Sequence, residues 1–460
     1  MLVKNADMLV QNARTPKLSK ARRILVELVD SAIEAGDPSS SMRKWVKVEA
    51  DKLKVGDCEV DFSEVGKIVA VGGGKAGAAM AITLEQLLGG RLTEGVVNIL
   101  EGTAPRKAAH KIKFVEAGHP IPSESGMEGV RQMLDLVSGL GSQDLVICLI
   151  SGGGSALMPL PAEGIELSEL QEATQLLLNS GATIQEFNAT RKHLSAFKGG
   201  QLARAAYPAR IVTLIISDVV GDSLDTIASG PTYWDLTTYQ YVLSVFEKYK
   251  LVEKMPPNVM ARVRNGVRGI IPEPPKIEEE CFRNAYYKII ASNANALQMA
   301  AEVGRAHNLN VHVLTTTMQG EARQVGEDLA SVAKEVYQVG KPIPVPGLLL
   351  SGGETTVTVR GKGLGGRNQE LVLSAALGLA GLENAAIVSF GTDGVDGPTD
   401  AAGAIADGFT LQRARELGLE PASYLENNDS YHFFEKLGDL VVTGPSGTNI
   451  MDITVLIISN

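Results

Sequence analysis

The sequence predicts an α/β protein with two domains. Short apolar runs of five to eight residues recur along the chain, and segments with helical periodicity lie between most of them. The runs are apolar throughout, which is typical of parallel strands covered by helices on both faces. A chain of 460 residues is also too long for one ordinary hydrophobic core.

Eight runs are predicted strands. In chain order they are KIVAV (67–71), GVVNIL (95–100), LVICLI (145–150), RIVTLIIS (210–217), KIIAS (288–292), VHVLTTT (311–317), GLLLS (347–351) and AAIVSF (385–390). Helical periodicity marks residues 294–308 and 321–339 between them. Residues 18–38 have the pattern of an amphipathic helix that can pack on either domain.

The domain boundary is predicted near residue 240. The segment IIPEPPKIEEE (270–280) is rich in proline and acidic residues, so we do not expect it to form a buried element. We therefore expect one domain over residues 1–240 and a second over residues 241–460, both with mainly parallel sheets.

The composition excludes several classes of protein. The formal net charge is −10 without any basic block, which argues against a nucleic acid or an anionic membrane as partner. The cysteines Cys58, Cys148 and Cys281 are too few and too scattered for a disulfide framework or a zinc site. No apolar run reaches the roughly 20 residues of a membrane helix, and the first residues lack the apolar region of a signal peptide. We therefore expect a cytoplasmic protein.

Unusual loops follow five of the predicted strands. They are GGGKAG (72–77), SGGGSAL (151–157), SDVVGD (217–222), SGGETTVTV (351–359) and GTDGVDGPTDAAGA (391–404). Ligands of parallel α/β sheets bind at the carboxyl ends of the strands, where these loops lie. Glycine lets the backbone aim several N–H groups at a phosphate, and the following helix adds its positive end. Tight turns alone explain one such loop, but not five at equivalent positions.

Three side chains near these loops are candidates for chemistry. Lys75 stands at a helix start, where the macrodipole disfavours a cation, so a negative group is expected nearby; a solvated lysine is the alternative. Asp218 ends an apolar run and suits a general base or, with Asp222, a magnesium ligand, although a helix cap or Asx-turn would also explain it. Arg367 precedes a predicted helix in a glycine-flanked loop, where a guanidinium can clamp phosphate or carboxylate.

Structural roles also explain other polar residues. His119 and His193 lack the sequence context of a catalytic triad or a zinc site. Asp393, Asp396 and Asp400 do not have the spacing of an EF-hand loop, and turn formation by Asp-Gly pairs explains them nearly as well.

Three functions remain open on these residues alone. Gly72, Gly74 and Gly77 match the dinucleotide pattern G-x-G-x-x-G, and Glu101 follows the next strand, where a ribose-binding acid is expected; this favours a dehydrogenase. Lys75 and the four further loops favour a phosphotransferase, which needs phosphate-binding loops, cations, magnesium and a carboxylate. The Walker A pattern is absent. A non-catalytic sensor of sugar phosphates or nucleotides would need fewer such loops.

The ordered set of motifs resembles the glycerate 2-kinases of the MOFRL type. The matching stretches are VGGGKAGAAMA, GHPIPSESG, SGGGSAL, FNATRKHLSAFKGGQLA, SDVVGDSLDTIASGPT, SGGETTVTV, GLGGRNQEL and GTDGVDGPTDAAGA, which together span nearly the whole chain. The resemblance implies phosphorylation of D-glycerate at O2 with ATP and Mg²⁺, giving 2-phosphoglycerate. It also implies a cleft between a Rossmann-like N-terminal domain and a smaller C-terminal α/β domain. Members have also been named hydroxypyruvate reductases, so an NAD(P)-dependent hydroxypyruvate reductase is the alternative.

The resemblance implies catalytic roles for the residues already selected, Lys75, Asp218 and Arg367. We expect Asp218 to orient or deprotonate the glycerate hydroxyl and to bind magnesium together with Asp222. Lys75 and Arg367 are expected to neutralise charge on the transferred phosphoryl group and to hold the substrate carboxylate. Nucleotide or phosphate binding is assigned to Gly73, Gly74, Ser151, Gly152, Gly153, Gly154, Ser155 and Lys198. Substrate contacts are assigned to Arg191, Glu354 and Asp393. A homodimer is left open.

Overall fold

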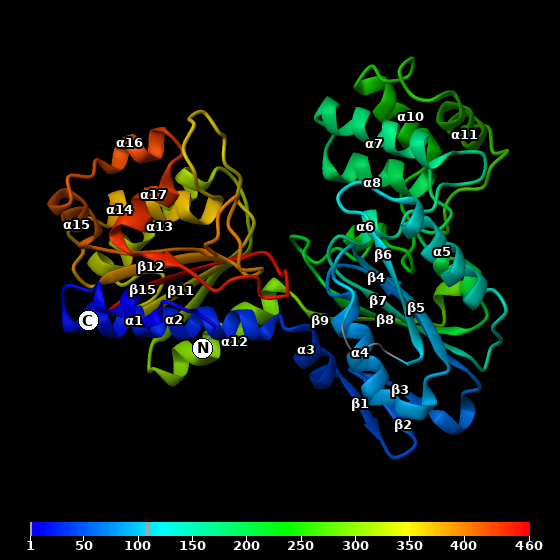
Figure 1. The fold of residues 1–460 in the computed structure, drawn as a ribbon, viewed down its shortest axis with the longest axis horizontal. Coiled ribbons are helices and arrows are strands. Elements are labelled where there is room, and N and C mark those ends of the chain that lie inside the picture. Colours follow the sequence, from blue (N-terminus) through cyan, green and yellow to red (C-terminus); the bar gives the residue numbers. More distant parts are fainter. Residues whose placement is uncertain (1, 106–109) are drawn as a thin grey trace. The chain divides into compact units, whose positions relative to one another are not determined.

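The fold of the computed structural model consists of two compact units (Figure 1). The structure describes residues 2–105 and 110–460. Ser41–Ile290 form one unit, and Met1–Ser40 together with Ala291–Asn460 form the other. We call the first the Rossmann unit and the second the mixed-sheet unit, after the sheets described below.

The Rossmann unit contains a six-stranded sheet with the strand order β6-β5-β4-β7-β8-β9. Adjacent strands from β6 to β8 pair in parallel. Among the strands of this sheet, β4 comes first along the chain. The next strands, β5 and β6, are added on one side of it, and β7, β8 and β9 on the other. The strand order therefore reverses between β4 and β7, and such a position is where ligands usually bind in sheets of this kind. The strands are β4 (Ile68–Gly73), β5 (Glu94–Leu100), β6 (Ile112–Ala117), β7 (Leu145–Ile150), β8 (Arg210–Ile216) and β9 (Ala285–Ala291).

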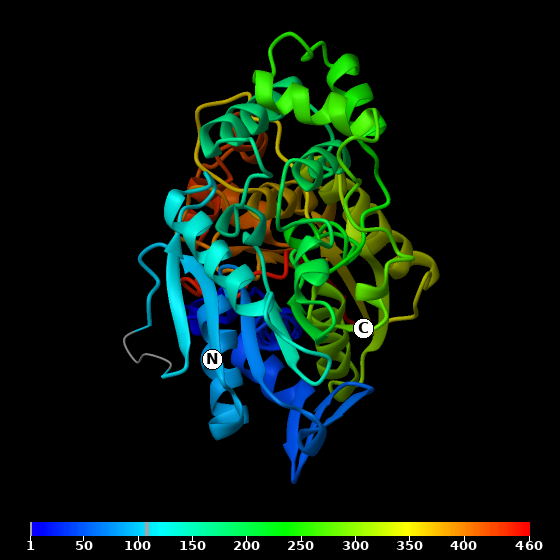
Figure 2. The same cartoon turned by 90° about the vertical axis from the view of Figure 1, so that its right-hand side faces the viewer.

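Helices cover this sheet, and a group of helices lies beyond the carboxyl ends of its strands, at the end where α6 follows β7 (Figure 1). A small antiparallel sheet, β1-β2-β3, lies at the opposite end, as the turned view in Figure 2 also shows. These elements are α3 (Pro38–Trp45), β1 (Val46–Glu49), β2 (Lys52–Val55), β3 (Cys58–Asp61), α4 (Gly77–Leu88), α5 (Glu124–Val137), α6 (Gly154–Leu157), α7 (Leu167–Ser180), α8 (Ile184–His193), α9 (Gln201–Ala206), α10 (Tyr239–Lys248) and α11 (Pro257–Val267), with 3-10 turns η1 (Phe62–Glu64), η2 (Gly89–Arg91), η3 (Ile227–Ser229) and η4 (Glu280–Phe282).

The mixed-sheet unit has the strand order β10-β11-β15-β12-β13-β14. Only β10 and β11 pair in parallel; β15 inserts between β11 and β12 and is antiparallel to both. This differs from the mainly parallel sheet that we expected, because the predicted strands did not include this last one. The strands are β10 (Asn310–Met318), β11 (Gly347–Gly353), β12 (Ala385–Gly391), β13 (Gly403–Asp407), β14 (Leu440–Val441) and β15 (Asp452–Ile458).

Helices pack on both faces of the mixed sheet, with α13 and α14 on one face and α2 and α12 on the other (Figure 1). The apolar positions of α13 and α14 meet strands β12 and β15 in one continuous buried cluster. The helices of this unit are α1 (Ala6–Gln11), α2 (Pro16–Ala35), α12 (Asn293–Ala306), α13 (Ala322–Val339), α14 (Arg367–Leu379), α15 (Thr410–Glu416), α16 (Pro421–Glu426) and α17 (Ser430–Leu437).

Buried charges attach the N-terminal helix α2 to this unit. The guanidinium of Arg22 is fully buried, and it donates to Asp407 at 2.7 Å and to Asp439 at 2.7 Å. Arg413 donates to the second oxygen of Asp439 at 2.7 Å. Because these carboxylates belong to residues 407–439, α2 folds with the C-terminal part of the chain.

The boundary that we expected at residue 240 therefore differs from the structure in two ways. The first 40 residues belong to the same unit as the C-terminal residues, and the chain leaves the Rossmann unit only after Ile290. The acidic, proline-rich segment lies inside the Rossmann unit, where Glu273 bonds to His193 Nε2 at 2.9 Å. Strand β9 follows it and extends the parallel sheet beyond β8.

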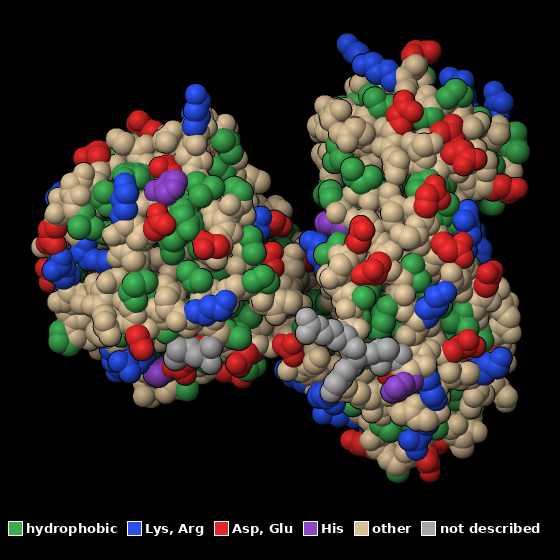
Figure 3. All heavy atoms as spheres, viewed as in Figure 1, with side chains coloured by type: hydrophobic (Ala, Val, Ile, Leu, Met, Phe, Trp, Pro, Cys, Tyr) green, Lys and Arg blue, Asp and Glu red, His purple; other side chains and the backbone are tan. Residues whose placement is uncertain are grey.

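The surface has no large field of one charge on the face seen in Figure 3, where acidic and basic side chains are interspersed over both units. In the described part of the chain, no helix combines the length and the hydropathy that crossing a bilayer requires.

Candidate active site

The loops after β4 and β7 pack directly on each other at the point where the strand order reverses. A Cβ atom on Gly72 would lie 2.0 Å from the Leu149 carbonyl oxygen, and one on Gly74 would lie 2.1 Å from Ser151 Oγ. Both glycines also have φ values, +134° and +145°, that other residues rarely adopt. Close packing of the end of β4 and its loop on β7 and the loop after it thus accounts for Gly72 and Gly74, two of the three glycines that also suggested a dinucleotide site.

The loop after β7 carries backbone donors that the fold does not use. Within the described residues, the amides of Gly152 and Gly153 have no hydrogen-bond acceptor. The Gly152 carbonyl instead accepts from the Lys75 amide at 2.8 Å. Free adjacent N–H groups at a strand end are suited to bind an anion, and phosphate binding at this loop stays a prediction.

The side chains of Lys75 and Asp218 both pack against the glycine loop after β7. A Cβ on Gly152 would lie 2.3 Å from Asp218 Oδ2, and one on Gly153 would lie 3.3 Å from the Lys75 side chain. The Lys75 side chain is exposed, and its ammonium has no protein partner among the described residues. Two predicted catalytic groups and the free amides are therefore brought together in the Rossmann unit.

The two aspartates assigned to magnesium have unusual environments. Burial raises the pKa of Asp218 above its usual value, and the nearby Lys75 charge opposes this rise only in part. Asp222 has a φ of +54°, in the left-handed region, and its Oδ1 is buried without a hydrogen-bond partner in the described structure. Such strain and an orphaned carboxylate oxygen gather at functional sites more often than elsewhere.

Arg191 and Lys198 lie next to the same loop, around a narrow pocket that they line together with Ser155 and Ser195. Lys198 is 3% exposed, and its Nζ donates to the Met158 carbonyl at 2.5 Å. Burial, reinforced by the charge of Arg191, lowers the pKa of Lys198 to about 7.

The mixed-sheet unit holds the other predicted catalytic residue. Arg367, the first residue of α14, donates to both oxygens of Asp452, through Nε at 2.5 Å and through Nη2 at 2.9 Å. Its Nη1 lies 2.8 Å from Glu354 Oε1. Two carboxylates thus hold the guanidinium in a fixed orientation at the edge of a pocket of about 550 Å³ that Val357 and Pro398 also line.

Two further predictions in this unit turn out to involve turn and cap geometry. Asp393 Oδ1 accepts from the Val395 amide at 3.1 Å, which is an Asx-turn. Asp396 is buried and accepts from the amides of Asn368 and Gln369 at 3.1 and 2.8 Å, so it caps the start of α14. The turn-forming alternative therefore explains both contacts, and a substrate contact of Asp393 stays a prediction.

Sequence reasoning gave too little weight to two residues. His119, which we assigned to structure, lies beside Gly153, and burial together with the charges of Lys75 and Arg191 lowers its pKa. Asp452 was not selected at all, although it opens an apolar strand just as Asp218 closes one. His193, by contrast, is buried between Ala189 O and Glu273, which agrees with a structural role.

Ser229 was not selected from the sequence either. It has a φ of +59°, and its Oγ lies 2.9 Å from Ser155 Oγ in the glycine loop. The sequence signal was the SGPT stretch that the resemblance already contains, where the residue before a glycine adopts a strained conformation to reach the loop.

Known proteins with similar sequences cover nearly the whole chain. Residues 24–264 match a family described as a domain of unknown function, DUF4147, and residues 347–452 match the MOFRL family. A glycerate 2-kinase of Pyrococcus horikoshii is 42% identical over 95% of this chain and 98% of its own length. A D-glycerate 2-kinase of Thermotoga maritima is 40% identical over 94% of this chain and 97% of its own length. The chain belongs to the MOFRL-type glycerate 2-kinase family.

Solved structures of family members agree with the fold described above. A crystal structure of a Pyrococcus horikoshii protein superposes with a TM-score of 0.87 at 41% identity, covering 96% of this chain and 99% of that one. A crystal structure of glycerate kinase from Thermotoga maritima gives a TM-score of 0.85 at 38% identity, covering 95% and 99%. An Agrobacterium vitis protein, 42% identical over 86% of this chain, has the provisional name of hydroxypyruvate reductase. The MOFRL-type glycerate 2-kinase family thus includes both names that the sequence suggested.

Proposed function

We propose that this chain transfers the γ-phosphoryl group of ATP to O2 of D-glycerate, giving 2-phosphoglycerate and ADP. The observation that carries the proposal is the loop after β7, whose free Gly152 and Gly153 amides adjoin Lys75 and Asp218. Phosphoryl transfer depends mainly on positioning and on electrostatic stabilisation, and this cluster contains donors, a cation and a carboxylate. The names of the Pyrococcus and Thermotoga relatives support the same reaction.

Asp218 suits the role of the group that orients or deprotonates the glycerate hydroxyl. Burial raises its pKa toward the range in which a carboxylate accepts a proton efficiently. It lies against Gly152, so a hydroxyl bonded to it would adjoin the free amides of the loop. The proton passes from the C2 hydroxyl to Asp218 as the oxygen attacks the γ-phosphorus.

Lys75 and Arg367 would neutralise charge on the transferred phosphoryl group. The Lys75 ammonium has no protein partner within the described residues and is free to meet a phosphate oxygen. Asp452 and Glu354 engage three N–H groups of Arg367, which leaves two of its five donors for a ligand. Glu354 would therefore act on the substrate through Arg367.

Asp218 and Asp222 are the residues that we assign to Mg²⁺. Magnesium usually takes one or two carboxylates together with substrate phosphates and waters, so it needs no larger protein cage. Within the described residues no cluster of three potential ligands is found, whereas Asp222 has a buried carboxylate oxygen without a partner. When bound, the ion would neutralise charge on the nucleotide phosphates. Phosphate contacts are assigned to Gly73, Gly74, Ser151, Gly154 and Ser155.

The reaction is tested by phosphorus NMR with purified protein, ATP, Mg²⁺ and D-glycerate. We expect the signals of 2-phosphoglycerate and ADP to grow together, and no phosphorylation at O3. A second arm supplies NADH and hydroxypyruvate without ATP. Robust NADH oxidation there, with no phosphorylated product in the first arm, would contradict the proposal and favour the reductase. We expect the reaction in the cytoplasm and leave a homodimer to a sedimentation measurement.

A further inference from the structure

The last turn of α8 carries three basic residues in a row, and they differ sharply in their partners. Lys192 is 2% exposed and forms ion pairs with Asp225 at 3.0 Å and Asp235 at 3.4 Å. His193 bonds to Glu273 at 2.9 Å. Arg191 has no hydrogen bond or ion pair in the described part of the chain; its guanidinium lies 4.0 Å from the centre of the Phe187 ring.

Lys198 is a second cation without a counterion, and it is buried, whereas Arg191 is partly exposed. Its ammonium donates to the Met158 carbonyl, and no carboxylate of the described residues pairs with it. Arg191, which is also positive, lines the same pocket, and its charge adds to burial in lowering the pKa of Lys198. Two cations thus lie side by side in a partly dry environment, and their mutual repulsion adds to the cost of burial.

Such a pair is costly for stability, so folding alone does not explain it. The fold supplies carboxylates to Lys192 and His193 on the same helical turn. Burial lowers the pKa of Arg191 to about 10, which is the sign of a charge that the protein leaves uncompensated. An anion from outside the chain would compensate both charges at once.

The pocket between the two cations fits a small anion. Its polar walls are Ser155, Thr174, Arg191, Ser195 and Lys198, and no acidic residue of the described chain lines it. Its volume is about 10 Å³, which is room for about one water molecule. An arginine binds a carboxylate through paired N–H groups, and the serine and threonine hydroxyls of the walls are further donors.

The pocket adjoins the groups assigned to phosphoryl transfer. Ser155 lies in the glycine loop, two residues after Gly153, which is in contact range of both Lys75 and His119. The charges of Lys75 and Arg191 both act on His119. A short acid with its carboxylate in the pocket would therefore have its next carbon near this loop, where Asp218 packs on Gly152.

We infer that Arg191 and Lys198 form the subsite for the carboxylate of the acceptor and thereby select a 2-hydroxy acid over an uncharged polyol. This specifies the substrate contact first assigned to Arg191 and replaces two earlier assignments, the phosphate contact of Lys198 and the substrate carboxylate at Lys75 and Arg367. It rests on the proposed function. A carboxylate held here presents the C2 hydroxyl, rather than the more distant C3 hydroxyl, to Asp218. The subsite thus accounts for phosphorylation at O2.

The test compares Arg191→Gln and Lys198→Met with a control, Lys248→Met, which removes one exposed, paired cation from the same unit. Steady-state kinetics give KM for D-glycerate and for ATP separately, and calorimetric titration measures binding of D-glycerate and glycerol without nucleotide. We expect each pocket variant to weaken glycerate binding by about 10- to 100-fold, since each removes one charge-assisted hydrogen bond. KM for ATP and all values of the control should stay within twofold.

Thermal unfolding separates this role from a structural one. Lys198→Met should unfold at the same or a higher temperature than the wild type, because it removes an uncompensated buried charge. Loss of stability together with activity in both pocket variants would overturn the inference. So would an unchanged KM for glycerate with a raised KM for ATP, which would make the pocket a nucleotide subsite.

Competition experiments distinguish failure of the subsite from failure of the proposed reaction. Acetate should displace bound D-glycerate more effectively than inorganic phosphate does, and glycerol should not displace it. Stronger competition by phosphate would overturn the inference. If the wild type binds acetate through these residues but does not phosphorylate glycerate, the subsite holds and the proposed function fails.

Discussion

Asp452 holds the Arg367 guanidinium through two hydrogen bonds, from Nε at 2.5 Å and from Nη2 at 2.9 Å. Asp452 is 1% exposed and is the first residue of β15, whereas Arg367 opens α14. A central strand and a helix therefore fix the orientation of an arginine whose remaining donors face a pocket.

We predict that Asp452→Asn lowers kcat by about 100-fold, because a misplacement of about 1 Å in a positioning contact can cost that much. Since Asp452 acts through Arg367, the double variant with Arg367→Ala should be no slower than Arg367→Ala alone. Asp400→Asn, which changes an exposed carboxylate of the same unit, is the control. If the fold-loss of kcat in the double variant equals the product of the losses in the two single variants, Asp452 has a role that does not pass through Arg367.

Lys75→Ala should lower kcat by roughly 100- to 1,000-fold, as expected when one preorganised electrostatic contact to the transition state is lost. The fold should persist, because Lys75 lies in the turn before α4, its side chain is exposed and its ammonium has no protein partner among the described residues. Lys67→Ala, at the other end of the β4 segment, provides the matched control. Kinetics with both substrates and the thermal midpoint are measured together. A folded Lys75→Ala enzyme with nearly full activity would refute the assignment.

The affinity for D-glycerate should fall as the pH rises above about 7. Burial and Arg191 lower the pKa of Lys198 to about 7, so its positive charge is present below that pH and is lost above it. Arg191 keeps its charge in this range, and no other ionisable side chain of the described residues lines the pocket. KM for glycerate, measured from pH 6 to 9, should rise with the loss of that charge. Lys198→Met should remove this rise, and a rise that persists in the variant would have another source.

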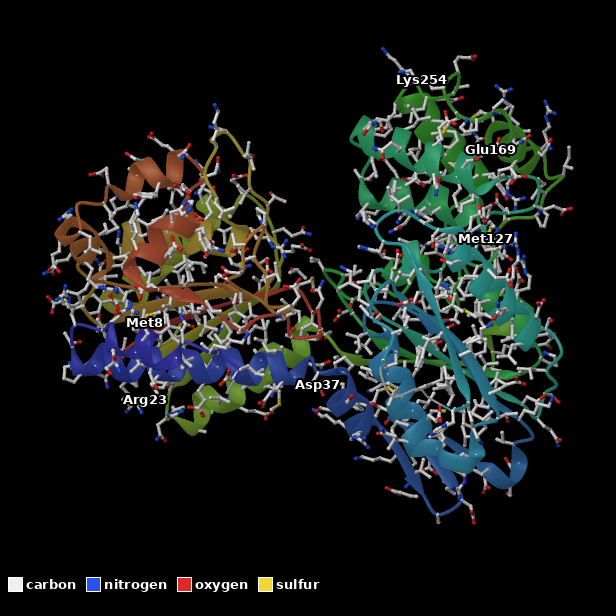
Figure 4. The ribbon with its side chains drawn as sticks, in the orientation of Figure 1. Met8, Arg23, Asp37, Met127, Glu169 and Lys254 are labelled. Atoms are coloured by element: carbon white, nitrogen blue, oxygen red, sulfur yellow. The ribbon has the colours of Figure 1, made fainter. Side chains whose placement is uncertain are left out.

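Arg22→Met should destabilise the mixed-sheet unit by about 3–5 kcal/mol, because Asp407 loses its ion-pair partner and remains buried. Arg23 is the next residue on the same helix but is exposed, and it is labelled on α2 in Figure 4. Arg23→Met should change stability by less than about 0.5 kcal/mol. Urea unfolding of both variants provides the measurement. Equal midpoints would mean that the buried network contributes little.

Local sequence patterns predicted the most apolar strands of both units. All eight predicted strands are present, because short apolar runs separated by helical segments are typical of strands in an α/β sheet. Strand β6 was missed because its residues 112–117 include a lysine and a glutamate in an edge strand. Strand β15 was missed although DITVLII is strongly apolar, and with it the antiparallel character of the second sheet.

The sequence predicted most residues of the candidate site, but it did not predict which side chains contact one another. Lys75, Asp218 and the loop 151–155 are in contact range, since the ends of parallel strands share one edge. Asp452 could not be found in the same way, because its role depends on pairing with Arg367, 85 residues earlier in the chain. The glycines before Arg367 also have contacts that the sequence did not predict, since Gly363 and Gly365 pack against Asp429 and Ser430.

Residues 1–40 and 291–460 form one unit, although the whole Rossmann unit separates them in the sequence, and this has a consequence for synthesis on the ribosome. Asn5 donates to the carbonyl of Leu440, a separation of 435 residues, so this contact must wait for nearly the whole polypeptide. At ordinary elongation rates that delay is about 20 to 90 s. Helix α2, with its apolar face and Arg22, is made long before α12, β12 and β15, the elements on which it packs. The Rossmann unit can be complete by then, while the apolar face of α2 stays open to a nascent-chain chaperone.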